Sequence, residues 1–315
     1  MRSMAKNTFP HHDILSAEQF SIKDLDIVMK RTDEMKRLVE KKGGSEILRG
    51  KIMTALFYEP SSRTFGSFIT SMQRLGGGII PIQGVAYSSV VKGESLPDTV
   101  RTFESYSDVI VIRHPEVGSA KIAAEFCQKP VINAGDGIGE HPTQALLDFF
   151  TICQHFPKVS GLTITMVGDL VNGRTIHSLA KLLSLYKGVR LNFVSPDELR
   201  VSPSLLSLLE ARKTTIVEYD DMDKTLSETD VLYITRVQKE RFSDQAMYER
   251  LKDRYLVTPK TLSKMKKRSI VMHPFPRVGG ITMDVDSDRR ALYISEQMRN
   301  GMYVRMALLS LMLGK

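Results

Sequence analysis

The chain has 315 residues, 42% hydrophobic and 25% charged, which is enough sequence for two domains with a core each. Its net charge of +8 is spread without an aromatic-interleaved stripe or finger motif, so small anions are expected as partners and nucleic acid is not. No apolar run is long enough for a membrane span, and segment 1–13 lacks the apolar core of a signal peptide, so we expect a cytoplasmic protein that begins with a linker.

Strand-like runs alternate with helical patterns at 51–58, 79–83, 108–113, 130–134, 162–167, 189–194, 214–219, 230–235 and 269–272. This alternation predicts an α/β protein, and the number of runs suits two sheets better than one. We expect two domains, each a mainly parallel sheet flanked by helices, linked by two interdomain helices. The first covers 1–150, the second covers 151–290, and the last helix, 291–315, returns to the first domain.

The segment after the first strand has the features of an anion-binding helix start. Pro60 breaks the strand, and Ser61 or Ser62 can cap the helix that follows. Ser62, Arg63 and Thr64 then lie on the first turn, where free N–H groups and the helix dipole favour an anion. An ordinary capped helix with a surface Arg is equally consistent with this segment. The core face of the helix is predicted at Phe65, Phe68, Ile69 and Met72.

A glycine-rich loop at residues 133–140 follows a strand and precedes His141 and Gln144, which share one face of a helix start. It lacks the dinucleotide and P-loop spacings, as does the loop at 167–174, so a nucleotide-dependent enzyme is a weak rival. A lone His here is more often a cap or a core residue. However, Arg113 ends another strand, and ligand-binding groups gather at the carboxyl ends of parallel strands.

Neither covalent catalysis nor a metal is supported by the sequence. It has no G-x-S-x-G elbow and no H-E-x-x-H pattern, and the cluster His11-His12-Asp13 falls in the expected linker. Cys127 and Cys153 lack metal-ligand spacing and are predicted to be reduced core thiols in helical segments. We expect no cofactor, so the chemistry would depend on positioning and electrostatics.

Four motifs occur in an order that resembles the aspartate carbamoyltransferases: PSSRT at 60–64, HPTQ at 141–144, TRVQ at 235–238 and HPFPR at 273–277. The resemblance covers residues 20–313 and is strongest to the transcarbamoylase domain of the eukaryotic multifunctional pyrimidine-synthesis proteins. It implies a homotrimer with sites shared between subunits, fused to other pyrimidine-pathway domains in the full-length protein.

The resemblance also implies residue roles. Domain 1–150 would bind carbamoyl phosphate through Ser62, Arg63, Thr64, Arg113, His141 and Gln144, with Ser88 and Lys92 supplied by a loop of the neighbouring subunit. Domain 151–290 would bind L-aspartate through Arg174, Arg236 and Gln238, the backbone of Phe275 and Pro276, and the same Lys92. Thr64, Arg113, His141 and Lys92 are the implied catalytic residues. Glu59 and Arg241 would belong to an ionic network that steadies the closed form.

The expected reaction moves the carbamoyl group of carbamoyl phosphate to the α-amine of L-aspartate. Arg174 and Arg236 favour aspartate over ornithine, because two guanidiniums can hold two carboxylates. An ornithine-type or other carbamoyltransferase and a catalytically silent assembly domain remain alternatives. The pair Gly279-Gly280 stands where relatives carry an acidic or amide residue followed by Glu, which bears on how tightly the domains lock. Phe65 replaces an Arg of bacterial members, with little expected effect.

Overall fold

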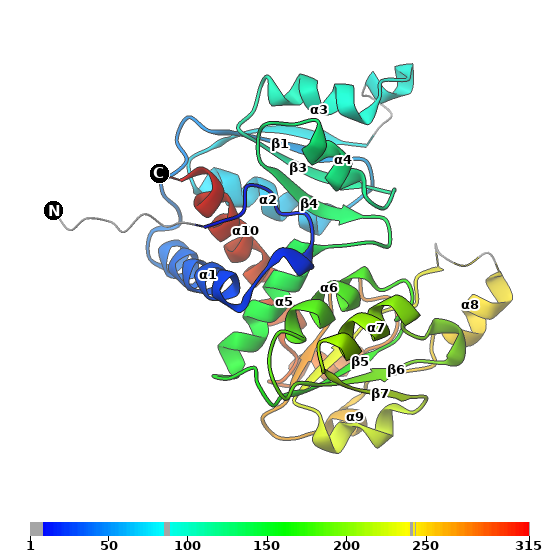
Figure 1. Ribbon diagram of the computed structural model, residues 1–315. Coiled ribbons are helices and arrows are strands. Elements are labelled where there is room, and N and C mark those ends of the chain that lie inside the picture. The colour runs from blue at the N-terminus through cyan, green and yellow to red at the C-terminus, as the bar shows by residue number, and fades with distance from the viewer. Residues whose placement is uncertain (1–8, 85–88, 240–241, 243, 315) are drawn as a thin grey trace. The chain divides into compact units, whose positions relative to one another are not determined.

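The computed structural model describes residues 9–84, 89–239, 242 and 244–314, and the chain divides into two compact units (Figure 1). The first unit contains the chain up to Leu146 together with the segment from Asn300 onward, and the second runs from Leu147 to Arg299. The two divisions fall within α5 (Pro142–His155) and near the start of α10 (Met298–Leu313).

The first unit is built on a parallel sheet in the order β2-β1-β3-β4. Its strands are β1 (Ile52–Phe57), β2 (Gly78–Gln83), β3 (Val109–His114) and β4 (Val131–Asp136). The sheet is accompanied by α1 (Ile22–Lys42), α2 (Ser62–Arg74), α3 (Leu96–Glu104) and α4 (Ser119–Glu125), and by the short helical turns Ala17–Gln19 and Ser89–Lys92. β3 is buried from Val109 to Ile112, as expected of an inner strand. Pro81 lies on the edge strand β2, where a missing N–H costs least.

The second unit has a parallel sheet in the order β7-β6-β5-β8-β9. Its strands are β5 (Thr163–Val167), β6 (Arg190–Val194), β7 (Thr215–Tyr219), β8 (Val231–Ile234) and β9 (Ile270–Met272). The helices are α6 (Arg174–Leu183), α7 (Pro203–Ala211), α8 (Gln245–Leu251) and α9 (Pro259–Ser263), with short turns at Asp197–Leu199, Met222–Lys224, Leu226–Glu228, Met283–Ser287 and Tyr293–Gln297. All nine predicted strand runs are present, and the predicted class, two parallel-sheet α/β domains flanked by helices, is confirmed.

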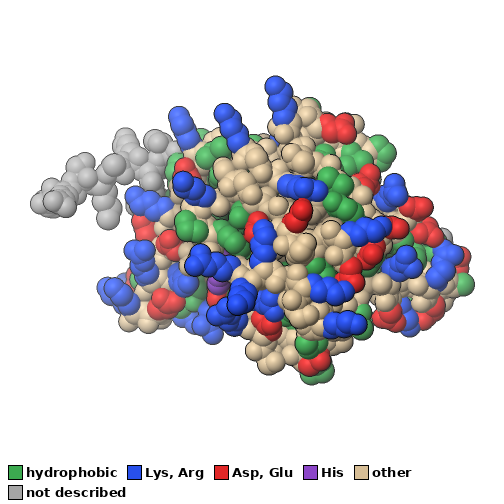
Figure 2. Space-filling model, turned by 90° about the horizontal axis from the view of Figure 1, so that it is seen from below, with side chains coloured by type: hydrophobic (Ala, Val, Ile, Leu, Met, Phe, Trp, Pro, Cys, Tyr) green, Lys and Arg blue, Asp and Glu red, His purple; other side chains and the backbone are tan. Residues whose placement is uncertain are grey.

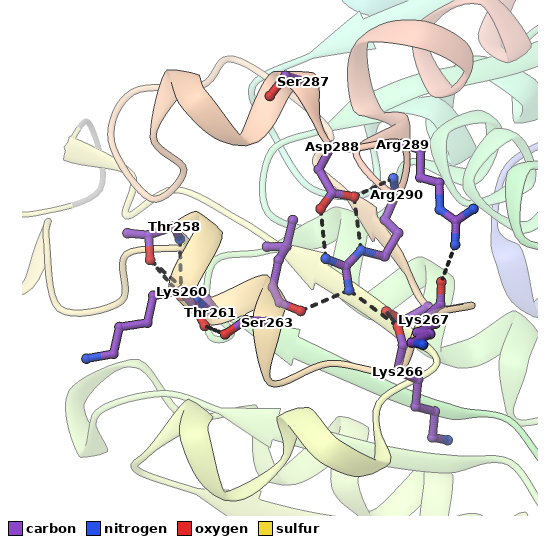
Figure 3. Close-up of polar contacts among 12 residues, drawn as sticks. Thr258, Lys260, Thr261, Ser263, Lys266, Lys267, Ser287, Asp288, Arg289 and Arg290 are labelled. Carbon is purple, nitrogen blue, oxygen red and sulfur yellow. Dashed lines mark hydrogen bonds and ion pairs between the residues drawn. The ribbon is translucent and has the colours of Figure 1, made fainter.

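The turn that contains Asp288 and Arg290, which follows the last strand β9 in the chain, holds α9 in place (Figure 3). Arg290 donates to both carboxylate oxygens of Asp288, at 3.0 and 2.7 Å. The same guanidinium donates to the carbonyl oxygens of Leu262 at 2.9 Å and Lys266 at 3.4 Å. Because one planar side chain meets both its carboxylate partner and the end of α9, it fixes the exit of that helix.

The prediction that segment 1–13 is a linker is wrong for its last residues, which pack on the first unit. Asp13 Oδ1 accepts the N–H of Val131 at 2.8 Å, and His11 Nε2 lies 3.3 Å from Asp24. The next residue, Ile14, is fully buried and pairs with Ile132 of β4. The polar composition of segment 1–13 does not predict this contact, because the fully buried Ile14 follows the segment.

The cysteine prediction needs a correction as well. Neither cysteine forms a disulfide, but Cys127 lies beyond the end of α4 and neither side chain is fully buried. Partial burial raises the pKa of the Cys127 thiol to about 11, which makes it unreactive as a thiolate.

Two further features concern the molecule's surface and its helices. Figure 2 shows Lys and Arg side chains spread over one face with Asp and Glu among them. Among the helices of the described part of the chain, none combines the length and the apolar character that a membrane span requires.

Candidate functional site

The N-terminus of α2 follows β1 and presents the predicted anion-binding residues. Ser61 occupies the cap position without a side-chain hydrogen bond to the helix, so its hydroxyl does not satisfy the first-turn N–H groups. Ser62 and Arg63 are exposed, whereas Thr64 is buried on the first turn. An uncapped helix start with a guanidinium beside it is favourable for a phosphate. The helix is anchored by its apolar face: Phe68 and Met72 are fully buried, and Phe65 meets Phe57 edge to face.

Arg113 ties together the ends of three neighbouring strands of the first sheet. Its guanidinium lies 3.3 Å from Glu59, which follows β1, and donates to the carbonyl of Ala134 on β4 at 3.4 Å. Its own carbonyl accepts the N–H of Tyr58 at 2.8 Å. The side chain is only 12% exposed. The pair with Glu59 is an interaction that sequence reasoning missed, since it depends on β1 and β3 being neighbours; Arg241 lies outside the described residues.

Asp136 holds the glycine-rich loop before His141 in place. Asp136 Oδ1 accepts the N–H of Glu140 at 2.7 Å and the amide of Asn133 at 3.2 Å, while its Oδ2 accepts the N–H of Gly118 at 2.8 Å. Gly137 has a φ of 51°, and a Cβ there would lie 2.4 Å from a backbone oxygen. Because Asp136 is bonded both within the loop and to the segment at Gly118, the loop serves as a rigid support and is not built like a nucleotide cradle.

His141 lies directly before α5. The sequence allows it to be a helix cap or a buried residue, and the structure shows both features. Its carbonyl accepts the N–H groups of Gln144 at 3.0 Å and Ala145 at 3.1 Å, so its main chain begins the helix. Its side chain is 4% exposed, with Nδ1 at 3.5 Å from the Thr143 hydroxyl. Gln144 is half-buried on the first turn. The imidazole is therefore held between a polar neighbour and the helix start.

A second histidine, His114, is half-buried at the same edge of the first sheet. His114 ends β3 and lies against Tyr58, with ring centroids 4.6 Å apart. Burial lowers the pKa of His114, so the neutral form is favoured there. It was not among the predicted site residues, although the sequence places it directly after Arg113.

In the second unit, Arg174 and Gln238 converge on one carbonyl. The oxygen of Asn172 accepts the backbone N–H of Arg174 at 3.0 Å and the side-chain amide of Gln238 at 3.0 Å. Asp169 supports the arrangement: its carboxylate accepts the N–H of Asn172 at 3.1 Å and that of Gln238 at 3.3 Å. Burial raises the pKa of Asp169. Neither Asp169 nor Asn172 was predicted, because their role depends on the pairing of β5 with β8.

Arg236 is half-buried and lies in the segment that directly follows β8, after Thr235 and before Gln238 in the sequence. Thr235 donates both its N–H and its hydroxyl to the carbonyl of Val167, at 2.9 and 3.1 Å. A Cβ at Gly168 would lie 2.2 Å from the Thr235 carbonyl. Glycine is thus required where the ends of β5 and β8 touch, and this contact keeps the loops that carry Arg174 and Arg236 adjacent.

The segment after β9 makes a constrained turn. Phe275 has a φ of 52°, unusual for an aromatic residue, and precedes a cis peptide bond to the exposed Pro276. Its N–H donates to Nδ1 of the buried His273 at 2.8 Å. Gly279 and Gly280 have φ values of 72° and 76°, so the chain there adopts a left-handed conformation that suits glycine and disfavours residues with a side chain.

The structure brings these residues together in two groups, each at the carboxyl edge of one sheet. The first unit holds Glu59, Ser62, Arg63, Thr64, Arg113, His141 and Gln144; the second holds Arg174, Arg236, Gln238, Phe275 and Pro276. Lys92 is exposed at the end of the turn Ser89–Lys92, and Ser88 lies outside the described residues.

Comparisons with known proteins match both units. Residues 12–154 match the family described as aspartate/ornithine carbamoyltransferase, carbamoyl-P binding domain, and residues 160–312 match its Asp/Orn binding domain. The multifunctional protein pyr1-3 of Dictyostelium discoideum is 49% identical over 99% of this chain, which spans only 14% of that relative's length.

Two further relatives match over nearly their whole length. An aspartate carbamoyltransferase catalytic subunit of Thermoplasma acidophilum is 49% identical, over 96% of this chain and 99% of its own. The crystal structure of aspartate transcarbamoylase from Trypanosoma cruzi in complex with carbamoyl aspartate and phosphate superimposes with a TM-score of 0.93, at 41% identity and full coverage of both chains. Because the family matches cover both units and these relatives align along nearly the whole chain, this chain belongs to the aspartate/ornithine carbamoyltransferase family.

Proposed function

We propose that this chain transfers the carbamoyl group of carbamoyl phosphate to the α-amine of L-aspartate, giving N-carbamoyl-L-aspartate and phosphate for pyrimidine synthesis. The observation that carries the proposal is the arrangement of Arg113. It bonds to groups after β1 and on β4, which supports a single site that combines the cations and hydroxyls near these three adjacent strand ends in the first unit.

The first unit supplies groups suited to carbamoyl phosphate. Arg63 and the first-turn N–H groups of α2 carry positive charge for the phosphate, with the hydroxyls of Ser62 and Thr64 as further donors. Arg113 and His141 would hold the carbonyl oxygen, and Gln144 the carbamoyl amide. A hydroxyl donated by Thr143 to Nδ1 of His141 would leave the proton on Nε2, which makes the ring a neutral donor.

The second unit supplies groups suited to a dicarboxylate amine. Arg174 and Arg236 each offer a planar guanidinium for one carboxylate, and Gln238 adds an amide beside them. The backbone carbonyl oxygens of Phe275 and Pro276 would accept the α-amine. An ornithine side chain would need an acidic partner in place of a guanidinium, and the predicted binding groups after β5 and β8 offer two cations instead.

In the reaction, the amine nitrogen attacks the carbamoyl carbon, the new C–N bond forms, and the C–O bond to phosphate breaks. Thr64, Arg113 and His141 would stabilise the oxyanion of the tetrahedral intermediate, each by about 2.7–4 kcal/mol. The departing phosphate can take the proton of the amine, so no protein nucleophile is needed. The remaining acceleration would come from holding both substrates in attack geometry.

Assembly and context belong to the same proposal. The exposed Lys92 and its neighbour Ser88 would complete the site of an adjacent subunit in a homotrimer. Glu59 would join Arg241 in the closed form. The match to a small part of multifunctional relatives supports fusion to other pyrimidine-pathway domains, and the two reduced thiols support a cytoplasmic location.

A colorimetric assay of carbamoyl-aspartate formation tests the proposal. Purified protein should form this product with carbamoyl phosphate and L-aspartate, and should form little citrulline when L-ornithine replaces aspartate. Product from ornithine alone would favour the other branch of the family. Absence of both products from a folded trimer would favour a silent assembly domain.

A further inference from the structure

A chain of buried hydrogen bonds in the second unit ends at the Phe275 turn. Asp148 on α5 accepts the Tyr233 hydroxyl at 2.7 Å and the side-chain amide of Gln297 at 2.6 Å. The carbonyl oxygen of that same Gln297 amide accepts the N–H of His273 at 2.9 Å. His273 Nδ1 then accepts the N–H of Phe275 at 2.8 Å.

The members of this chain come from four separate elements and are shielded from water. Asp148, Tyr233, Gln297 and His273 are each at most 1% exposed. They lie on α5, on β8, in the turn Tyr293–Gln297 and directly after β9. Since buried polar groups need partners, the bonds in this chain constrain one another.

Groups that can only donate or only accept fix which way each bond points. The two carboxyl oxygens of Asp148 accept from Tyr233 and from Gln297, so Gln297 turns its NH₂ group toward Asp148. The Gln297 oxygen then necessarily faces the N–H of His273. Because His273 Nδ1 accepts the N–H of Phe275, the proton of the neutral ring is on Nε2. Asp148 at one end and the backbone N–H groups of His273 and Phe275 at the other thus fix the polarity of the path to the turn together.

We propose that Asp148 is a positioning residue that acts through Gln297 and His273 to hold the Phe275–Pro276 turn in the conformation that binds the amine of the second substrate. This inference rests on the proposed function, in which the carbonyls of that turn accept the α-amine. The left-handed φ of Phe275, 52°, is the reason a fixed anchor is needed, since a phenylalanine without one would relax to a commoner conformation.

Exchanging the carboxyl and amide groups of Asp148 and Gln297 tests whether the direction of the hydrogen bonds matters or only the packing of the side chains. Asp148→Asn keeps the shape but replaces one acceptor oxygen with an NH₂ group, so the bonds from Tyr233 and Gln297 can no longer both be accepted. Gln297→Glu keeps an acceptor for His273 but places a second carboxylate beside Asp148. In the double variant, the amide introduced on α5 can donate to the carboxylate introduced in the turn, while its oxygen accepts from Tyr233. The bond between positions 148 and 297 is then reversed, the bonds from Tyr233 and His273 keep their direction, and the network carries the same charge as in wild type.

Kinetics with each substrate varied in turn test the inference. Each single variant should lower kcat/KM for aspartate by about 10²-fold, as expected for a misplaced binding group, and should leave carbamoyl phosphate affinity unchanged. The double variant should recover to within about tenfold of wild type. Tyr233→Phe is the matched control: it removes a bond to Asp148 on the side away from the turn, so it should lower stability and spare aspartate use.

Two outcomes would overturn the inference while leaving the proposed function intact. One is a folded Asp148→Asn variant with wild-type aspartate kinetics, and the other is a double variant no better than the worse single variant. If Asp148→Asn does not fold, the comparison of Gln297→Glu with the double variant decides.

A spectroscopic measurement keeps the two proposals distinguishable. If the wild-type protein forms no carbamoyl-aspartate, the proposed function fails. The effect of Asp148 on the Phe275–Pro276 turn can still be measured from the ¹⁵N chemical shifts of the His273 ring. These shifts should report a proton on Nε2 and a hydrogen bond accepted by Nδ1 in wild type. Asp148→Asn should lose the accepted bond; identical shifts in the two proteins would overturn the inference.

Discussion

Arg113 illustrates how one residue can be readied for its role before a substrate arrives. Its ion pair with Glu59 and its bond to the Ala134 carbonyl hold the guanidinium in a nearly buried position. A donor that is already oriented costs no reorganisation when charge develops on the substrate. The sequence indicated Arg113 because it ends a strand, but the partners depend on sheet order, which the sequence does not determine.

Replacement of Arg113 by Ala should depress turnover more than binding. We expect kcat to fall by about 10²- to 10³-fold, because the lost contact is strongest with the developing oxyanion. Steady-state kinetics and carbamoyl phosphate titration would measure the two effects. Arg101→Ala is a suitable control in the same unit, since Arg101 is exposed and lies over Phe126. Unchanged kcat in the Arg113 variant would refute its role.

Arg63 and Arg236 should divide the two substrates between them. Arg236→Ala should raise KM for aspartate by about 10²-fold, the scale of a lost charged partner, and spare carbamoyl phosphate binding. Arg63→Ala should show the opposite bias. Calorimetry of carbamoyl phosphate and kinetics in aspartate would provide both numbers. If both variants impaired the two substrates equally, the assignment of one substrate to each unit would be wrong.

Among the helices, strands and turns, the strands were predictable and several connections were not. Runs of Val and Ile mark buried parallel strands, and every predicted run is present. The anchoring of Asp13 on β4 and the turn at Phe275 escaped prediction, because each depends on contacts that the sequence pattern does not reveal. The groups that support the site, Asp136 and Asp169, stood in loops noted for their glycines, but their partners lie in segments brought close only by the fold.

The turn that holds α9 should contribute to stability in a pH-dependent way (Figure 3). Hydrogen bonds from Arg290 hold the pKa of Asp288 below its ordinary value. A carboxyl with a lowered folded pKa stabilises the protein above the unfolded value and loses that contribution as pH falls through the folded one. Asp288→Asn should therefore cost about 0.5–1 kcal/mol near neutral pH.

The difference in unfolding free energy between wild type and Asp288→Asn should shrink from about pH 5 downward. Urea unfolding at a series of pH values would measure it. Asp197→Asn provides the control, because the Asp197 carboxylate is 83% exposed beside Arg200 and should contribute little at any pH. A difference that stayed constant down to about pH 3 would rule out ionisation of Asp288 as its source.

For the molecule as a whole, the proposed trimer makes each site depend on two chains. Lys92→Ala and Arg236→Ala proteins should each be nearly inactive. In mixed trimers, a site that combines the body of a Lys92→Ala chain with the loop of an Arg236→Ala chain has both wild-type residues. Random equal mixing in a cyclic trimer should restore about one quarter of the sites.

Co-refolding the two variants and measuring carbamoyl-aspartate formation would test this sharing. Activity near that fraction of wild type supports a loop that crosses between subunits. If trimers confirmed by mass showed no recovery, Lys92 would act in its own chain or outside the chemistry.

The groups on the two units are proposed to serve one reaction, and a single ligand can test this. N-(phosphonacetyl)-L-aspartate joins a phosphonate to an aspartyl dicarboxylate, so one association cost covers both sets of contacts. Calorimetry should find one molecule bound per chain, with far higher affinity than phosphate or succinate. Arg63→Ala and Arg236→Ala should each weaken this binding by about 100-fold or more. Binding that is no tighter than that of the separate fragments, or that is unaffected by either substitution, would show that the two groups do not serve one reaction.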